Sequence, residues 1–333
     1  MHQVLIAESL DLPTLLQQCE QYNVQISGAN IMSRISNSDI SLSYQPDIPA
    51  ADLPKYLAEF SGLIVRPKPV NAACFKAAPN LRLIVRGGAG LNSIDLIEAK
   101  KNSVIVENTP GENSISTAEY SFGLLWEMIA NRQILRAHND VIHNNFQAVE
   151  FYRGHELYRK TIAMIGFGAI GKEMAKRCLG FGMQVRVFSR SLKTSVANDF
   201  GVCAFDSLEE LLCEKNDAIS LHIPLTSATN NLFDEKLFAL MPDFPAVLIN
   251  AARPQLIDPA GLNYAVNAGK ISRFAIDGDF ELIEPFMELP CRNSGLFTHH
   301  IADTTAEAQA NITRQVVKQI VSFFRDGIII NSA

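Results

Sequence analysis

A glycine-rich turn between an apolar strand and a helix is the sharpest chemical signal in the sequence. Three glycines spaced as GxGxxG follow the apolar run Thr161–Ile165 and open a helical pattern. The first glycine permits a tight turn, the second lets the backbone approach a pyrophosphate, and the third lets the helix pack on the strand. Free N–H groups at the helix N-terminus attract phosphate. The motif predicts a dinucleotide site that contains Gly166, Gly168, Ala169, Ile170 and Gly171.

The choice of dinucleotide depends on the residues that follow the next apolar run, Gln184–Phe188. An acidic side chain at that position binds the ribose 2′-hydroxyl of NAD, but this chain has Ser189 and Arg190. A hydroxyl and a guanidinium suit a 2′-phosphate, whereas a carboxylate would repel it. The pair predicts that NADP is accepted. The alternative, in which Arg190 stacks on the adenine and NAD is used, stays open.

Polar side chains also stand at the carboxyl ends of three later apolar runs. Arg253 follows the first run and His300 the third. Asp277 ends the second run, with Glu281 and Glu284 close behind. Because ligands of open α/β sheets bind beyond the carboxyl ends of the strands, we expect these side chains to meet. Arginine can hold a carboxylate through two hydrogen bonds, and histidine can transfer a proton near neutral pH. The set predicts chemistry on a 2-oxo acid, with a carboxylate orienting the histidine.

The elements that must position these residues form a repeating β-α pattern. The apolar runs are too continuous for one-sided strands and are typical of a parallel sheet covered on both faces. The repeats predict a doubly wound α/β fold. The expected strands are Val4–Ala7, Leu63–Val65, Leu81–Val85, Val104–Val106, Thr161–Ile165, Gln184–Phe188, Ala218–His222, Ala246–Asn250, Phe274–Asp277 and Leu296–Thr298. The expected helices are Asp52–Phe60, Ser93–Lys100, Ala169–Phe181, Leu208–Cys213, Asp234–Leu240 and Asp258–Ala268.

The β-α pattern occurs in two series, separated by a long helical stretch at about Ser116–Asn139. A last helix, at about Ala306–Phe324, leads back to the first series. We therefore expect a Rossmann doubly wound domain, residues 113–303, inserted into a second, flavodoxin-like α/β domain. The second domain would be discontinuous, with residues 1–112 and 304–333, and would bind the substrate.

Composition narrows the class of protein. The chain has 333 residues, 47% of them hydrophobic, and a formal net charge of −6. It has no block of Lys or Arg, which argues against a nucleic-acid partner. Its six cysteines are scattered without a CxxC pair, as expected for reduced thiols in a cytoplasmic protein. We find neither a signal-peptide pattern nor an apolar run of the roughly 18 residues that a membrane span needs.

Taken together, the motifs identify a family. The chain resembles the D-isomer-specific 2-hydroxyacid dehydrogenases over nearly its whole length, and within them is most similar to the phosphoglycerate dehydrogenase branch. Besides the glycine turn, the matching segments are Val65-Arg66-Pro67, Ile84–Gly90 with Ile94-Asp95, Asn108–Gly111, Ala118-Glu119, His222–Thr226, Asn250–Arg253, Glu284-Pro285, and His300-Ile301 with Thr305–Ala308. The chain ends soon after Gly327, so we expect no C-terminal regulatory domain.

The resemblance implies roles for individual residues. Arg253 would bind the substrate carboxylate and polarise the C2 oxygen, His300 would be the general acid/base, and Glu284 its carboxylate partner. Asp277 would contact the nicotinamide carboxamide. The remaining implied residues are His222, Pro224 and Ala251 in the cofactor cleft, Gly87, Gly88, Ala89 and Gly90 offering N–H groups to the carboxylate, and Arg66 and Arg86 near a substrate phosphate.

The chain also departs from the family pattern. Pro254 follows Arg253 where the family usually has glycine, which removes an N–H and could shift the arginine. Leu282 stands at the family's usual glutamate position, so Glu284 is preferred because proline follows it, and Glu281 stays possible. A second histidine precedes His300, but neighbouring strand side chains point to opposite faces, and we predict no metal site.

The resemblance implies an NAD(P)-dependent oxidoreductase, with 3-phosphoglycerate, a precursor for serine biosynthesis, as the first substrate to test. Glyoxylate or hydroxypyruvate reduction is the alternative that Ser189-Arg190 mildly favours. A nucleotide-sensing, corepressor-like scaffold is the alternative from another class. We also expect a homodimer, held partly by an apolar helix face with Phe122, Leu125, Trp126 and Ile129. The same face could instead be core.

Overall fold

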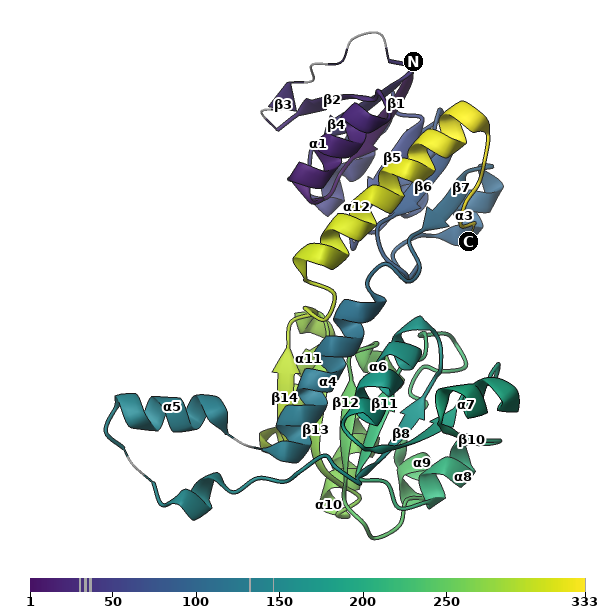
Figure 1. Ribbon diagram of the computed structural model, residues 1–333. Helices are drawn as coiled ribbons and strands as arrows, with labels where there is room; N and C mark the ends of the chain where they lie inside the picture. Colours follow the sequence, from purple (N-terminus) through teal and green to yellow (C-terminus); the bar gives the residue numbers. More distant parts are fainter. Residues whose placement is uncertain (30, 33–34, 36–37, 132, 146, 333) are drawn as a thin grey trace. The chain divides into compact units, whose positions relative to one another are not determined.

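The computed structural model of the protein describes every residue except 30, 33–34, 36–37, 132, 146 and 333 (Figure 1). The chain divides into two compact units. Unit 1 comprises Met1–Asn113 and Thr304–Ala333, and unit 2 comprises Ser114–Asp303. Unit 2 is therefore an insertion in the sequence of unit 1, which contains both ends of the chain.

Unit 1 is built on a seven-stranded sheet in the order β3-β2-β4-β1-β5-β6-β7. Its strands pair in parallel, except that β3 is antiparallel to β2. The strands are β1 (His2–Ile6), β2 (Gln25–Gly28), β3 (Ile31–Met32), β4 (Ile40–Tyr44), β5 (Gly62–Val65), β6 (Leu83–Arg86) and β7 (Ile105–Asn108). The helices are α1 (Leu12–Gln21), η1 (Ala50–Tyr56), α2 (Ala72–Ala77), α3 (Leu96–Lys101), α12 (Ala306–Val321) and η5 (Ser322–Asp326).

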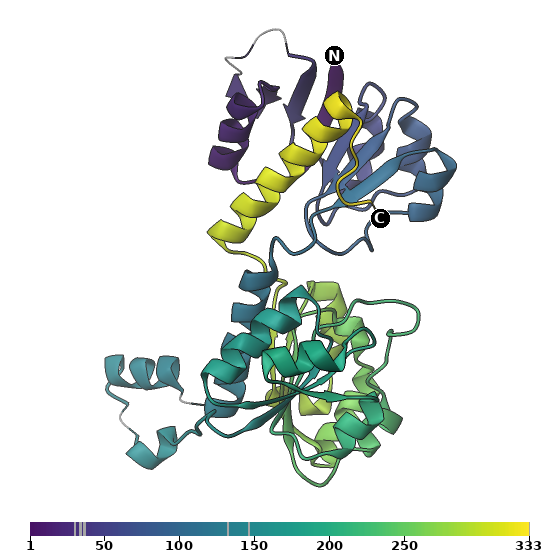
Figure 2. The ribbon, with the colours of Figure 1, turned by 45° about the vertical axis from the view of Figure 1, so that its right-hand side comes forward.

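Both faces of the unit 1 sheet are buried, which explains the continuous apolar strands. Val4 and Ile6 of β1 belong to one core cluster with α1 and α12, whereas Leu5 belongs to another with η1, α2 and α3. Successive strand residues point to opposite faces, so each face receives its own helical layer. Figure 2 shows α12, in yellow, lying along the unit 1 sheet.

Unit 2 is built on a seven-stranded parallel sheet in the order β10-β9-β8-β11-β12-β13-β14. The strands are β8 (Thr161–Ile165), β9 (Gln184–Phe188), β10 (Cys203–Phe205), β11 (Ala218–Leu221), β12 (Ala246–Asn250), β13 (Ile271–Asp277) and β14 (Gly295–Thr298). The helices are α4 (Ser114–Ala130), α5 (Ile134–Ile142), η2 (Val149–Tyr152), α6 (Ala169–Gly180), α7 (Thr194–Phe200), α8 (Leu208–Cys213), α9 (Glu235–Ala239), η3 (Pro254–Leu256), α10 (Pro259–Asn267), α11 (Phe280–Met287) and η4 (Pro290–Ser294). The chain reverses its direction across the sheet between β8 and β11, which is the switch point of a Rossmann fold.

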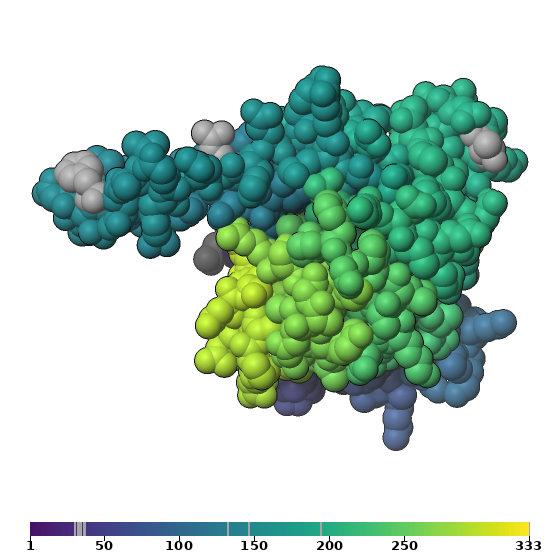
Figure 3. All heavy atoms as spheres, turned by 90° about the horizontal axis from the view of Figure 1, so that it is seen from below, coloured from purple at the N-terminus to yellow at the C-terminus, as the bar shows by residue number. Residues whose placement is uncertain are grey.

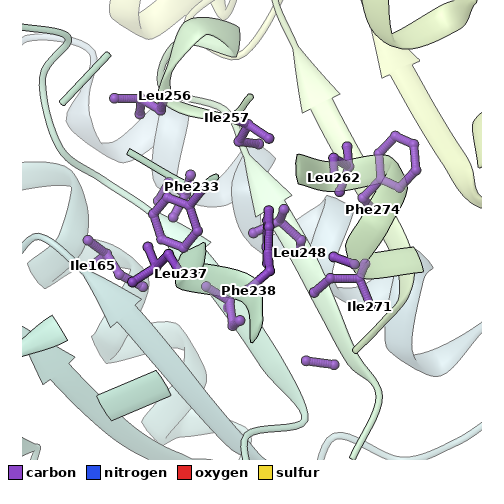
Figure 4. Close-up of a cluster of buried hydrophobic side chains, with 14 of the residues drawn as sticks. Ile165, Phe233, Leu237, Phe238, Leu248, Leu256, Ile257, Leu262, Ile271 and Phe274 are labelled. Carbon is purple, nitrogen blue, oxygen red and sulfur yellow. The ribbon is translucent and has the colours of Figure 1, made fainter. Parts of the chain in front are cut away.

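Two hydrophobic clusters cover the two faces of the unit 2 sheet. One joins Ile165 and Leu248 to side chains of α8, α9, α10 and α11, with Phe233, Phe238 and Phe274 fully buried (Figure 4). The other joins Met164 to α4 and α6. The α/β fold predicted from the sequence is confirmed.

Several elements differ from the prediction. The long helix ends at Ala130, because Asn131 and Gln133 adopt positive φ values of 46° and 49°, and α5 follows as a separate helix. No residue of α5 is buried, and the segment projects from the rest of unit 2 (Figure 3). The strands β2, β3, β4 and β10 were not predicted, and the helix expected at Asp52–Phe60 is a 3₁₀ helix that contains Pro54.

The apolar face of α4 packs largely within unit 2, and the dimer surface predicted there stays a prediction. Leu125 and Ile129 are 0% and 6% exposed inside the second cluster of unit 2. Phe122 and Trp126 pack on Phe181 of the same unit, with ring centroids 4.8 and 5.6 Å apart.

Across the described residues, we find no helix with the length and hydropathy required to span a bilayer.

Candidate active site

The carboxyl ends of five neighbouring strands lie at one level of the unit 2 sheet. The register aligns Ile165 of β8, Leu221 of β11, Asn250 of β12, Ile276 of β13 and Phe297 of β14. The segments that leave these strands therefore start along the same edge, where ligands of doubly wound sheets bind. This edge brings together the glycine turn and the segments that hold Arg253 and His300.

The glycine turn has the geometry that a pyrophosphate requires. Gly166 has φ of 101°, and a Cβ there would lie 2.3 Å from the carbonyl oxygen of His222. A Cβ on Gly171 would lie 2.5 Å from the carbonyl oxygen of Gly166, so both positions need glycine. Gly168 is the N-cap of α6, has open space on its Cβ side and makes no side-chain capping bond. The first N–H groups of α6, including those of Ala169 and Ile170, are therefore available to an anion.

His222 lies against the glycine turn, and its imidazole is neutral near pH 7. Its Nε2 lies 2.9 Å from Oγ of Ser220, and burial lowers the pKa of His222 to about 4. Pro224 and Ala251 follow β11 and β12 at the same edge. Ser189 is half-buried and Arg190 exposed directly after β9, so the segment after this strand offers a hydroxyl and a cation but no carboxylate.

The side-chain amide of Asn250 holds the backbone around Arg253 at the end of β12. The carbonyl of Arg253 accepts a hydrogen bond of 2.8 Å from Nδ2 of the buried Asn250, whose Oδ1 accepts one of 3.1 Å from the N–H of Ala252. Burial lowers the pKa of the Arg253 guanidinium, while the charges of Asp279 and Asp303 oppose this shift. Asn250 was not predicted as a site residue, although its place at the strand end is a usable signal.

The proline after Arg253 fits its surroundings. Pro254 is the first residue of η3, where a helix needs no N–H donor, and it is buried. A Cβ added to Gly278 would lie 2.3 Å from Cγ of Pro254, so the ring fills the space that this glycine leaves. The close approach holds the end of β13 against the segment that follows Arg253.

His300 is paired with a carboxylate that the sequence analysis did not select. Its Nδ1 lies 3.0 Å from Oδ1 of Asp279, and the two side chains are 38% and 51% exposed. The structure does not bring Glu284 to His300. Glu284 and Glu281 are exposed on α11, and the carboxylate of neither forms a hydrogen bond or an ion pair within the described part of the chain.

Asp277 is engaged by the backbone that follows His300. It is 2% exposed and accepts hydrogen bonds from Oγ1 of Thr298 at 2.7 Å and from the N–H groups of Ile301 and Ala302, both at 3.1 Å. The family resemblance predicted that this carboxylate contacts the carboxamide of the nicotinamide. In the structure both of its oxygens hold the segment from residue 298 to residue 302.

The predicted substrate residues of unit 1 also form a group. Nε of Arg86 donates to the carbonyl of Arg66 at 3.2 Å, and Nε of Arg66 donates to the carbonyl of Gly87 at 3.3 Å. Oε1 of Gln309 accepts a bond of 2.5 Å from Arg66. The N–H of Gly87 is already bonded to Val65, so Gly87 cannot offer it to a ligand as predicted. In the segments that the structure describes, the N–H groups of the next three residues, Gly88, Ala89 and Gly90, have no such bond.

Known proteins share this architecture. Residues 124–302 match the family model described as "D-isomer specific 2-hydroxyacid dehydrogenase, NAD binding domain". A D-3-phosphoglycerate dehydrogenase of Archaeoglobus fulgidus is 34% identical over 274 residues, which cover 81% of this chain and 50% of that protein. The chain thus spans about half the length of that relative. The hydroxypyruvate reductase of Thermotoga maritima is also 34% identical over 274 residues, with coverage of 81% and 86%. A D-lactate dehydrogenase from Aquifex aeolicus, solved with NAD and lactic acid, is 25% identical with a TM-score of 0.76 and coverage of 100% and 99%.

Proposed function

Since the chain belongs to the D-isomer-specific 2-hydroxyacid dehydrogenase family, we propose that it is an NAD(P)-dependent enzyme that interconverts a D-2-hydroxy acid and its 2-oxo acid. One observation carries the proposal. The segments that hold Arg253 and His300 leave the same edge of the sheet as the glycine turn. A cofactor on that turn and a substrate on Arg253 would both lie beside the imidazole.

Each side chain has a distinct task in this proposal. The guanidinium of Arg253 holds the substrate carboxylate and polarises the C2 oxygen, and its partial burial strengthens both interactions. His300 donates its proton to the C2 oxygen during reduction and removes it during oxidation. The nicotinamide, when bound, supplies or accepts the hydride. The α6 N-terminus holds the pyrophosphate.

A kinetic screen of 2-oxo acids tests the proposal. We expect turnover with at least one acid, and a loss of about 10²–10⁴-fold in kcat for His300→Ala, the usual contribution of a general acid/base. The affinity of that variant for the nucleotide should stay unchanged, because the imidazole lies outside the phosphate cradle. Absence of turnover with every acid would favour the nucleotide-sensing scaffold instead.

For the substrate we propose 3-phosphoglycerate first. The adjacent Arg66 and Arg86, with Gln309 holding the first guanidinium, support an anion site in unit 1. Relatives named as phosphoglycerate dehydrogenase and as hydroxypyruvate reductase match to the same extent, so the same screen includes hydroxypyruvate and glyoxylate. Arg66→Met should abolish any preference for a phosphorylated acid while sparing the turnover of glyoxylate.

For the cofactor we propose that NADP is accepted beside NAD, since Ser189 and Arg190 are available to a 2′-phosphate. Arg190→Ala should lower kcat/KM for NADPH more than for NADH. Equal losses for both cofactors would support stacking on the adenine.

We also propose a homodimer, with α5 as a contact surface. Ile134 and Leu135 at the start of α5 are 65% and 79% exposed, and Val141 and Ile142 at its end are 57% and 58% exposed. Exposed apolar patches of this kind mark contact surfaces. Light scattering should report twice the monomer mass for the wild type and the monomer mass for Leu135→Glu.

A further inference from the structure

Asp279 contacts the imidazole that the proposed function uses for proton transfer. We infer that Asp279 is the positioning carboxylate of His300, in the role that family resemblance gave to Glu284. The inference rests on the proposed function for its catalytic meaning. The pairing itself can be tested without turnover.

The contact defines which imidazole nitrogen faces the reaction. Nδ1 of His300 lies 3.0 Å from Oδ1 of Asp279. A carboxylate can only accept, so Nδ1 must carry the proton of this bond. Nε2 is then the nitrogen left for the C2 oxygen of the substrate, and the neutral imidazole keeps the tautomer that accepts a proton there. Asp279 therefore orients the ring and selects its tautomer.

The carboxylate of Asp279 is free for this role because it does not cap its own helix. Asp279 is the N-cap of α11, yet it makes no capping bond. The other aspartates at helix N-caps, Asp11, Asp95, Asp234 and Asp258, all accept a hydrogen bond from the first turn of their helices. An aspartate at this position normally satisfies a helix N–H. The carboxylate of Asp279 bonds to His300 instead, which indicates that this residue orients the imidazole.

Two further contacts place the partners. Pro254 against Gly278 holds the residue before Asp279 beside the segment of Arg253. Asp277 holds the two residues that follow His300 through their N–H groups. His300 itself has φ of 47°, an unusual conformation for a residue with a side chain, which persists only when neighbours impose it. The end of β13 thus controls both the ring and its backbone.

The alternative carboxylates lie on the exposed side of α11. Glu281 and Glu284 are two and five residues beyond Asp279, and both are exposed. In the part of the chain described by the structure, neither has a hydrogen bond with any histidine. The proline after Glu284 matched the family motif, but it sits inside α11 without turning the glutamate toward the site.

Kinetic measurements on four variants test whether the pairing of Asp279 with His300 contributes to catalysis. Asp279→Asn should lower kcat about 10- to 100-fold, less than the loss expected from removing the acid/base itself. KM and cofactor affinity should change less than threefold, because Asp279 acts through the imidazole. Asp279→Glu should restore part of kcat. Glu281→Gln and Glu284→Gln should retain wild-type kcat, and a large loss in either, with Asp279→Asn unaffected, would overturn the inference.

Asp234→Ala is the control for an effect on stability, because alanine removes the capping acceptor that asparagine would keep. Asp234 is also an N-cap aspartate of unit 2, but its carboxylate bonds to the N–H of Leu237 at 2.9 Å. This variant should lose stability without losing kcat. Equal losses of kcat in Asp234→Ala and Asp279→Ala would overturn the inference, because the loss would then follow from reduced stability of unit 2.

Nitrogen-15 spectra of the imidazoles give a readout that does not depend on turnover. The signals of His300, assigned with His300→Gln, should show the Nδ1–H tautomer in the wild-type protein. In Asp279→Ala they should shift to the Nε2–H tautomer that free histidine prefers. If the wild type turns over no 2-oxo acid, the proposed function fails, yet this shift still supports the pairing. An Nε2–H tautomer in both proteins would overturn it.

Discussion

The close packing of Pro254 against Gly278 predicts that a methyl group added at Gly278 lowers the stability of unit 2, by an amount that follows from the distances. In Gly278→Ala the new methyl would lie 2.3 Å from Cγ and 3.0 Å from Cδ of Pro254, and 3.2 Å from Cγ2 of Ile283. Pro254 is a rigid ring and both neighbours are buried, so neither can move aside easily. Gly278 does not have a positive φ, so strain from the backbone is not expected. The effect of the substitution should come from the clash.

Overpacking of this kind costs about 1–3 kcal/mol. Replacing glycine with alanine returns about 0.4–1 kcal/mol, because the unfolded chain has fewer conformations to lose. The net loss should be about 1–2 kcal/mol, which for a unit of this size lowers Tm by roughly 2–8 °C. Trp126, the one tryptophan of the sequence, lies in α4 of unit 2, so its fluorescence reports the unfolding of that unit.

A double-mutant cycle isolates the contact. In a Pro254→Ala background the space is vacant, and Gly278→Ala should cost close to nothing there. Gly123→Ala is the control, because Gly123 lies within α4 with nothing within 4 Å of the added methyl. Alanine should stabilise that helix position by about 0.5–1 kcal/mol. An equal cost of Gly278→Ala in both backgrounds, or a gain in stability in the wild type, would show that the Pro254–Gly278 clash does not control the effect.

Three further predictions concern other buried groups. Asp277→Asn should lower the free energy of unfolding by about 1–3 kcal/mol, because an amide donor would replace one of the acceptors that hold the segment after His300. Denaturant titration followed by Trp126 fluorescence measures the loss, and an unchanged midpoint would contradict the prediction. The pKa of His222 is lowered to about 4 by burial, so the unfolded chain binds the proton first as pH falls and stability decreases below about pH 6.5. Between pH 7 and pH 5 the loss should be about 2 kcal/mol, and the curve for His222→Gln should be flatter; equal slopes would refute this. Burial raises the pKa of the Cys178 thiol to about 12, so iodoacetamide at pH 8 should modify the exposed Cys203 and leave Cys178 intact in the native protein, as mass spectrometry can establish.

Local patterns alone were sufficient for a large part of the site. The glycine turn needs only a strand, a tight turn and a helix start, and all three are encoded within a dozen residues. Arg253 and His300 were recognisable because each follows an apolar strand. Parallel strands bring their carboxyl ends to one edge whatever the loops do, so their common placement followed from the strand pattern.

The strands that sequence patterns missed are short or lack a clear period. Strands β2 and β4 contain serine beside apolar residues, and β10 is largely exposed, so none of the three shows the continuous run of a buried strand. The helical pattern continued past Ala130, but the chain turns away through left-handed residues, which periodicity does not report. As a result α4 packs against the sheet of unit 2, whereas α5 lies on the surface of the unit.

The sequence by itself determined the α/β fold, the glycine turn and the two groups that we propose act on the substrate, because each depends on residues close together in the chain. Only the tertiary structure decided which carboxylate serves His300. Asp279, Glu281 and Glu284 are nearly equivalent in sequence distance, and the register of β13 with β14 selects among them. This register pairs Asp277 with Thr298 and places the carboxylate of Asp279 3.0 Å from the imidazole of His300. Glu281 and Glu284 lie farther along, on the exposed side of α11.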